Sequence, residues 1–306
     1  MNTKSKISLC MAAMVVACPA LAVAQTATGT GATVSSNGTA TGAYSNATGT
    51  AATATGYAAK ATGYYSTATG TNSQATGAQA TANGQGAAAT GDYSVAFGAA
   101  SVSSGVLSTA VGDSAVASGV NSTAVGGGSL ASGVNSTASG VSSKASGDYS
   151  SVFGTSGLAS GYAATAVGDN AQAAGGNGTA TGTNSVASGL STTATGYGAK
   201  ATGVQATALG VTATASGDNS TSLGMISTAS GLQSTAVGTA SVASGLNSNA
   251  IGFAASATND NSVALGTAAA ATGANSTALG GQSVASGANS TATGQYSKAI
   301  DRKSVV

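Results

Sequence analysis

Glycine, alanine and serine recur along this chain at a spacing of seven residues. In steps of seven from Gly42 to position 294, 36 of the 37 positions are glycine, and the exception is Asn259. Alanine almost always stands two residues before each of these positions, and serine or alanine stands four residues before it. The repeating unit is therefore Ser-x-Ala-x-Gly followed by two variable residues, and no insertion interrupts it.

The residue before each glycine shows that the structural period is fourteen. From residue 97 to residue 293, eleven of the fifteen members of one series are bulky and apolar, whereas the interleaved series from Ser104 to Ser286 holds only Ser, Thr and Ala. Two heptads therefore make one repeat with two different faces. The bulky members are Phe97, Val111, Val125, Phe153, Val167, Leu209, Leu223, Val237, Ile251, Leu265 and Leu279.

A fourteen-residue unit of this kind predicts two short strands and two tight turns. Alternate residues of a strand point to opposite sides, so Ser and Ala face a narrow interior and the residue before Gly faces outward. Gly supplies the positive φ or the close backbone approach of a tight corner. Lysines occupy one position of the fourteen, on the Ser/Thr strand, which predicts a solvent-facing side; they are Lys60, Lys144, Lys200 and Lys298. We therefore expect an all-β parallel solenoid of about eighteen stacked coils.

Two other structures fit the pattern less well than the solenoid. A heptad coiled coil would carry a glycine in every heptad, at a cost of about 1 kcal/mol each relative to alanine. Disorder is common in Gly/Ser-rich chains, but disordered segments seldom hold so strict a register. A lone rod would also expose its bulky series as a large apolar patch, which favours self-association along that side.

Composition narrows the functions that the chain can perform. Of 306 residues only 5% are charged, there is no His, and the only cysteines are Cys10 and Cys18. The six Asp residues within the repeats are single and lie at turn positions, and the chain has no Glu. Catalysis, a metal site and a cofactor are therefore not expected, and without clustered Lys and Arg neither is nucleic-acid binding.

The first 24 residues resemble a secretory signal. Lys4 and Lys6 precede an apolar stretch, and Ala22-Val23-Ala24 forms an A-x-A cleavage site before Gln25. A short membrane anchor and lipidation of Cys18 are the alternatives. We expect a signal peptide at 1–24, a lead-in at 25–37, a repetitive head at 38–300 and a short tail at 301–306, with no membrane-spanning segment in the mature chain.

Segments such as 121–126, 261–266 and 275–280, which read Asn-Ser-Thr/Val-Ala-Val/Leu-Gly, resemble the head repeats of YadA-like trimeric autotransporter adhesins. The resemblance covers about 38–300. It implies a left-handed parallel β-roll, a homotrimer with the bulky series at the interface, and a surface-exposed head that binds matrix proteins such as collagen, host cells or other surfaces. We expect an exported protein because of the signal sequence at 1–24. The family's neck, stalk and membrane anchor have no counterpart here, so we expect the protein at the outer membrane if an anchor exists and secreted otherwise.

The same resemblance suggests ligand-binding positions, because the family motif N-S-V-A-I-G-x-x-S is linked to collagen recognition. An ordinary coil-forming role for any single copy is the favoured alternative. The skeleton of the motif recurs in three copies: Asn121, Ser122, Val125, Gly126 and Ser129; Asn219, Ser220, Leu223, Gly224 and Ser227; and Asn275, Ser276, Leu279, Gly280 and Ser283.

Adhesion is the predicted function, and all nine Tyr residues occupy turn positions that suit a contact surface. Two alternatives are kept. The Thr-Ala-Thr ladder at 39–41, 53–55 and 67–69 resembles an ice-binding face, although it ends at Asn83. The second alternative is a purely structural rod in a surface coat or biofilm matrix. Because the bulky position is Thr or Asn between 38 and 90, the N-terminal coils are expected to fray more easily.

Overall fold

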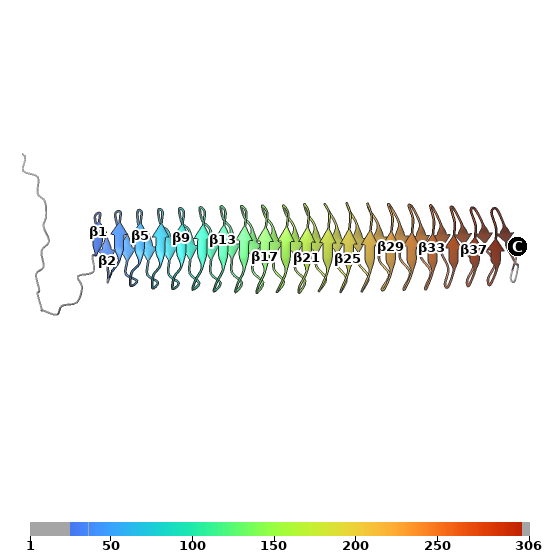
Figure 1. Ribbon diagram of the computed structural model, residues 1–306, viewed down its shortest axis with the longest axis horizontal. Coiled ribbons are helices and arrows are strands. Elements are labelled where there is room, and N and C mark those ends of the chain that lie inside the picture. Colours follow the sequence, from blue (N-terminus) through green and yellow to red (C-terminus); the bar gives the residue numbers. More distant parts are fainter. Residues whose placement is uncertain (1–24, 36, 302–306) are drawn as a thin grey trace, which may run out of the picture.

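The computed structural model describes residues 25–35 and 37–301, which form one straight row of coils (Figure 1). Strands account for all the regular secondary structure of this part of the chain, so the solenoid prediction is confirmed and the heptad helix is excluded. The expected signal peptide, Cys18 and residues 302–306 of the expected tail lie outside the described residues.

Each coil contributes one strand to each of two parallel sheets. We call the sheet of three-residue strands the A sheet and the sheet of two-residue strands the B sheet. The A sheet consists of β1 (Thr26–Thr28), β3 (Thr39–Thr41), β5 (Thr53–Thr55), β7 (Thr67–Thr69), β9 (Thr81–Asn83), β11 (Val95–Phe97), β13 (Thr109–Val111), β15 (Thr123–Val125), β17 (Thr137–Ser139), β19 (Ser151–Phe153), β21 (Thr165–Val167), β23 (Thr179–Thr181), β25 (Thr193–Thr195), β27 (Thr207–Leu209), β29 (Thr221–Leu223), β31 (Thr235–Val237), β33 (Asn249–Ile251), β35 (Val263–Leu265), β37 (Thr277–Leu279) and β39 (Thr291–Thr293).

The strands of the B sheet alternate with these along the chain. They are β2 (Thr33–Val34), β4 (Asn46–Ala47), β6 (Lys60–Ala61), β8 (Gln74–Ala75), β10 (Ala88–Ala89), β12 (Val102–Ser103), β14 (Val116–Ala117), β16 (Leu130–Ala131), β18 (Lys144–Ala145), β20 (Leu158–Ala159), β22 (Gln172–Ala173), β24 (Val186–Ala187), β26 (Lys200–Ala201), β28 (Thr214–Ala215), β30 (Thr228–Ala229), β32 (Val242–Ala243), β34 (Ser256–Ala257), β36 (Ala270–Ala271), β38 (Val284–Ala285) and β40 (Lys298–Ala299).

Every strand before the last coil pairs in parallel with its equivalent one coil further along. In β13 and β15, for example, Thr109 pairs with Thr123 and Val111 with Val125, a register of fourteen residues. The first coil differs, because Thr26 pairs with Thr39 at a distance of thirteen residues. The segment 25–37, which the sequence sets apart as a lead-in, thus carries β1 and β2, and the structure has twenty coils where the sequence predicts about eighteen.

Backbone pairing continues through the turns as well as the strands. We call the turn from an A-sheet strand to the next B-sheet strand the first turn, and the turn back to the A sheet the second turn. In a first turn Gly128 N donates to Asp113 O at 2.8 Å, and in a second turn Asn121 N donates to Val106 O at 2.9 Å. Turn amides are therefore satisfied by the neighbouring coil, and each coil depends on its neighbours for stability.

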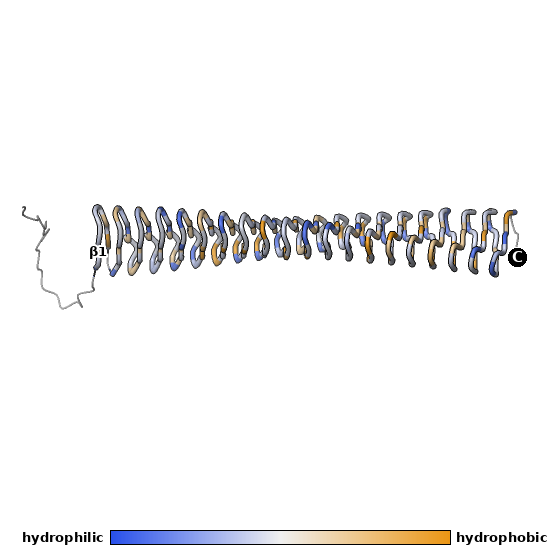
Figure 2. Tube along the Cα trace, turned by 90° about the horizontal axis from the view of Figure 1, so that it is seen from above, coloured by the Kyte–Doolittle hydropathy of each residue, from blue (hydrophilic) through white to orange (hydrophobic). Residues whose placement is uncertain are grey.

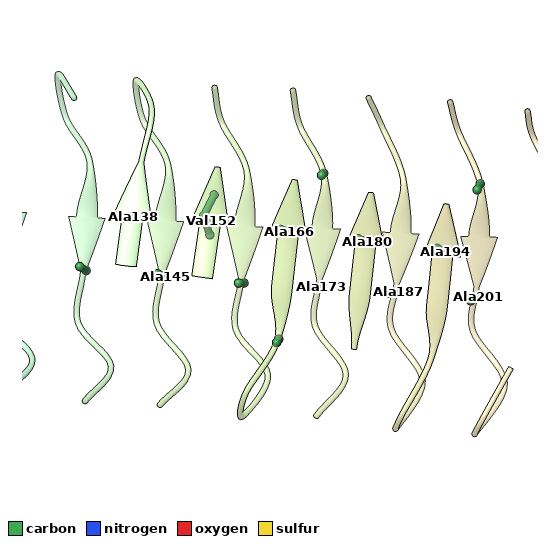
Figure 3. Packing of buried hydrophobic residues seen from close by; sticks show 14 of the residues in the cluster. Ala138, Ala145, Val152, Ala166, Ala173, Ala180, Ala187, Ala194 and Ala201 are labelled. Atoms are coloured by element: carbon green, nitrogen blue, oxygen red, sulfur yellow. The ribbon is translucent and has the colours of Figure 1, made fainter. Parts of the chain in front are cut away.

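The interior between the two sheets is as narrow as the sequence predicts. Its side chains are almost all Ala and Ser with 0% exposure, and Val152 is the largest fully buried side chain (Figure 3). Two Ser residues that replace the usual interior Ala are matched by a partner five residues later. Ser103 Oγ lies 2.6 Å from Ser108 Oγ, and Ser222 Oγ lies 2.6 Å from Ser227 Oγ.

The two glycines of a coil are required for different reasons. Gly112, which follows an A-sheet strand, has φ +133°, and an added Cβ would lie 2.7 Å from the carbonyl oxygen of Gly126. Gly119, which lies two residues after the B-sheet strand β14, has no positive φ, but its Cβ would lie 2.0 Å from the carbonyl oxygen of Gly133. Positive φ explains only half of the glycine pattern, and close contact between consecutive coils explains the other half.

Candidate functional site: the outer faces of the rod

The outer face of the A sheet carries the bulky series predicted to be the trimer interface. The third residue of each A-sheet strand points outward, and in the isolated chain Phe97 remains 53% exposed and Phe153 49% exposed. The first residue of the same strands is half-buried and is Thr in most coils. From β11 to β37 this face is therefore a ladder of mainly Thr beside a ladder of mainly Val, Leu, Ile and Phe. Apolar residues recur at intervals along the rod (Figure 2).

The three motif copies are built identically, and only part of each is accessible. Their Asn side chains are exposed in second turns, where Asn121, Asn219 and Asn275 have φ values between +53° and +57°. The bulky residue of each copy belongs to the A-sheet ladder. The six Ser residues are completely buried; they are Ser122, Ser129, Ser220, Ser227, Ser276 and Ser283.

The final Ser of each motif copy closes the first turn from the inside. Ser129 Oγ donates to Gly126 O at 2.9 Å, and the other two copies repeat this bond between Ser and Gly. Within the described part of the chain, the hydroxyl of Ser122 has no hydrogen-bond partner, nor do its equivalents in the other two copies. Of the side chains in these motifs, only the Asn and the bulky residue are thus accessible to a ligand.

Asn side chains form a ladder along the second turns. Asn121 Nδ2 donates to Asn135 Oδ1 at 3.2 Å. Further along the rod the amides of four consecutive coils are linked from Asn247 to Asn289, with donor–acceptor distances of 3.1–3.2 Å. Two of the motif Asn residues, Asn121 and Asn275, therefore stabilise contacts between coils in addition to being exposed.

Four Asp residues have a role that the sequence did not reveal. Each occupies the first position of a second turn, which is the residue directly after the repeat glycine, or after Asn259 in the coil that lacks that glycine. The carboxylate accepts the backbone N–H of the equivalent residue one coil earlier. Asp148 Oδ1, for example, accepts from Val134 N at 2.9 Å, and Asp92, Asp218 and Asp260 make the same bond. Asp113 and Asp169 lie in first turns instead. The position of Asp within the fourteen-residue repeat was a signal that could have separated these two groups.

Tyr residues form three edge-to-face pairs on the turns. Tyr44 and Tyr57 meet across neighbouring coils with ring centroids 5.7 Å apart, and Tyr64 and Tyr65 lie 4.2 Å apart within one turn. A hydrogen bond with Tyr65 raises the pKa of Tyr64 above its ordinary value of 10.0, and loss of solvation and the charge of Tyr65 add to the increase. A third pair joins Tyr149 and Tyr162.

The B sheet is less polar than the sequence predicts. The four Lys residues are exposed, as predicted, but their column also holds half-buried apolar residues such as Val116, Leu130 and Leu158. A further apolar set occupies the first position of several second turns, where Val106, Leu190 and Leu232 are exposed. The prediction of a solvent-facing side on the Ser/Thr strand is therefore incomplete, because it did not consider the apolar residues that share the lysine position.

The described residues offer neither a metal cluster nor a helical membrane span. No group of three or more potential ligands among Cys, Asp and Glu could hold a metal ion within residues 25–35 and 37–301. No helix of sufficient length and apolar character to cross a bilayer is present in that part of the chain.

The comparison with protein families agrees with the repeat geometry. The family model described as YadA head domain repeat matches residues 47–73, 75–101, 103–129, 131–156, 159–185, 174–199, 187–210, 201–225, 229–252, 243–269 and 271–297. Among solved structures, a chain titled as the collagen-binding domain of the Yersinia adhesin YadA is 26% identical, over 58% of this chain and 68% of that one. Its TM-score is 0.19, which is too low to support a statement about this protein. No curated protein sequence matches the chain. Because the family repeats extend over most of its length, this chain belongs to the YadA head repeat family.

Proposed function

We propose that the protein is the rod-shaped head of a surface adhesin, without enzymatic activity, that attaches cells to host matrix proteins such as collagen, to other cells or to surfaces. The observation that carries this proposal is the family match along the rod, which assigns the coils to YadA head repeats. The described residues add a long array of exposed Tyr and Asn on turns, where a partner could reach them.

The head acts as a homotrimer of left-handed rolls in this proposal, with the bulky A-sheet ladder buried at the common axis. Exposed apolar residues such as Leu209, Leu223 and Ile251 recur every fourteen residues on one face, and soluble monomers seldom tolerate apolar patches of that length. The proposed arrangement has a signal peptide at 1–24, the head at 38–300 and display outside the cell.

Solid-phase binding of the purified full chain to collagen and to cultured cells tests the proposed attachment. The three motif copies are tested with Asn121→Ala, Asn219→Ala and Asn275→Ala combined in one protein. Asn247→Ala is the matched control, because Asn247 occupies the same turn position and donates to Asn261 at 3.2 Å but lies outside the three copies. Saturable binding that the triple variant loses and the control keeps supports the motif sites. Binding that the triple variant keeps would assign these Asn residues to coil stability alone, and absence of any saturable binding would contradict the adhesive function.

A further inference from the structure

A groove crosses three consecutive coils on the B-sheet side of the rod. It has a volume of about 320 Å³ and is partly open to solvent. One wall is formed by three first turns, each of which contributes the second residue after its glycine. The other wall is formed by the first residues of the strands β18, β20 and β22. The lining consists of Ser142, Ser156 and Asn170, of Lys144, Leu158 and Gln172, and of Gly157.

The parallel register gives the groove a regular geometry. Lys144 pairs with Leu158, and Leu158 pairs with Gln172, so the three side chains lie in a row on neighbouring strands. Because neighbouring strands lie about 4.8 Å apart, the row extends over roughly 10 Å. That length accommodates one pyranose ring with its substituents, and the volume is at the lower end of the range for small-molecule sites.

The charge of the lining favours an anion at one end. It contains one ammonium group, on Lys144, and no carboxylate. The hydroxyl of Ser142 lies at the same end of the groove. The carboxylate of Asp169, the residue before Asn170, is not among the lining groups. A ligand carboxylate placed beside Lys144 would gain a charge-assisted hydrogen bond, which is stronger than a bond between neutral groups.

The remaining lining favours a polyhydroxylated ring. Asn170 Nδ2 already donates to Asn184 Oδ1 at 2.8 Å, which leaves Asn170 Oδ1 to accept from a ligand hydroxyl. Gln172 and Ser156 can each donate and accept. Leu158, which is half-buried between Lys144 and Gln172, offers an apolar surface to the C–H face of a sugar.

We propose that this groove binds a single carboxylate-bearing sugar residue, such as a uronic acid, with the carboxylate at Lys144 and Ser142, the ring over Leu158 and the hydroxyls at Asn170 and Gln172. The proposal deepens the adhesive function and rests on it, because it assigns a ligand class to one place on the rod. Lys144, Leu158 and Gln172 lie on the B sheet, whereas the proposed trimer buries the A-sheet ladder, so the groove does not coincide with the proposed interface.

Lys200 provides a matched control. It holds the position of Lys144 four coils further along, on β26, and is equally exposed. The corresponding rows around it are Gly198, Thr212 and Ile226, and Lys200, Thr214 and Thr228, so it has no amide side chain to receive the sugar hydroxyls.

The test is a titration of the purified full chain with methyl glucuronide, methyl glucoside and glucose 6-sulfate. Binding of each sugar is measured by ligand-observed NMR. We expect the glucuronide to bind at least about tenfold more tightly than the glucoside, which has the same ring without the charge. Lys144→Ala should weaken glucuronide binding about tenfold, whereas Lys200→Ala should leave it within about twofold. Ser156→Asp places a carboxylate in the groove at a turn position that tolerates Asp, and it should abolish binding.

Three results would overturn the proposal: equal binding of glucoside and glucuronide, equal weakening by Lys144→Ala and Lys200→Ala, or tighter binding of glucose 6-sulfate, which would assign the groove to sulfated sugars. Circular dichroism melting of each variant shows whether a loss of binding reflects unfolding. Attachment to collagen and cells is measured separately on the same variants. If the protein binds glucuronide but does not attach to collagen or cells, the adhesive function is rejected and the sugar site is kept. If the protein attaches but does not bind glucuronide, the sugar site alone is rejected.

Discussion

Val152 and Gly157 compensate each other across the interior of one coil. Val152 replaces the usual interior Ala, and Gly157, five residues later, replaces the usual interior Ser or Ala. A Cβ on Gly157 would lie 2.6 Å from Val152 Cγ1, a distance that real Cβ contacts do not show. The larger side chain is therefore accommodated because its neighbour has none.

This relationship predicts a non-additive pair of substitutions. Gly157→Ser should destabilise the rod by about 1–3 kcal/mol through overpacking against Val152. In a Val152→Ala background, the same substitution should be nearly neutral, since it restores the composition of the other coils. Thermal unfolding of the four proteins of the double-mutant cycle measures the coupling. Additive effects would show that the two side chains do not compete for the same space.

The two reasons for glycine, close contact between coils and positive φ, lead to a second prediction. Gly119→Ala should be severely destabilising, because the new Cβ would lie 2.0 Å from the Gly133 carbonyl oxygen. Gly86 is the control, because it has φ +67° but no atom lies within 4 Å of the place that its Cβ would take. Gly86→Ala should therefore cost only about 1–2 kcal/mol of backbone strain. Melting temperatures of the two variants, compared with the unsubstituted protein, check the order. A larger loss for Gly86→Ala would contradict the account.

The Asp bonds between second turns predict a difference between two groups of Asp. Asp148→Ala removes the acceptor of the Val134 N–H and should destabilise by about 0.5–1 kcal/mol, near the lower end for a hydrogen bond because the site is exposed. Asp148→Asn retains an Oδ1 acceptor and should restore most of the loss. Asp113→Ala, in a first turn, should have little effect. Amide exchange at Val134 reports the bond directly, and unchanged protection in Asp148→Ala would show that the carboxylate does not hold this amide.

The Tyr64–Tyr65 pair predicts a late step in the phenol titration. Because a hydrogen bond with Tyr65 raises the pKa of Tyr64, Tyr64 should retain its proton at a pH where an ordinary exposed Tyr has lost it. Tyr65→Phe removes the hydroxyl partner and should lower the pKa of Tyr64 towards 10.0. The absorbance of tyrosinate, followed with pH in both proteins, measures the shift. Tyr93→Phe, a change in an exposed ring elsewhere, should leave the late step in place.

The A-sheet ladder predicts a change of assembly state. Leu209→Asp together with Leu223→Asp places two charges on the proposed trimer interface, where burial without partners is costly. Analytical ultracentrifugation of the full chain should then show monomer in place of trimer. Val186→Asp, on the B sheet, should leave the trimer intact. A monomeric unsubstituted protein would remove the proposed role of the ladder.

Most of the architecture could be predicted from the repeat. In a solenoid each residue meets the same surroundings in every coil, so one fourteen-residue pattern specifies strand, turn, interior and exterior throughout. The parallel stacking, the Ala and Ser interior, the exposed Lys residues and the outward bulky series were all predictable for this reason. The coil within the lead-in was not, because it is one residue shorter than the repeat and its glycines fall out of register.

The period, the two-sheet coil and the family resemblance all follow from the order of residues alone, because they depend on the alternation of side chains along single short strands. The tertiary structure was needed to see which departures from the pattern compensate one another, which Asp residues accept an amide of the preceding coil, and where Lys144, Leu158 and Gln172 form a groove. These features join residues five or fourteen positions apart, and their distances depend on how the chain turns at each corner. Side-chain direction follows from strand geometry alone, but the distance between two side chains on different strands does not.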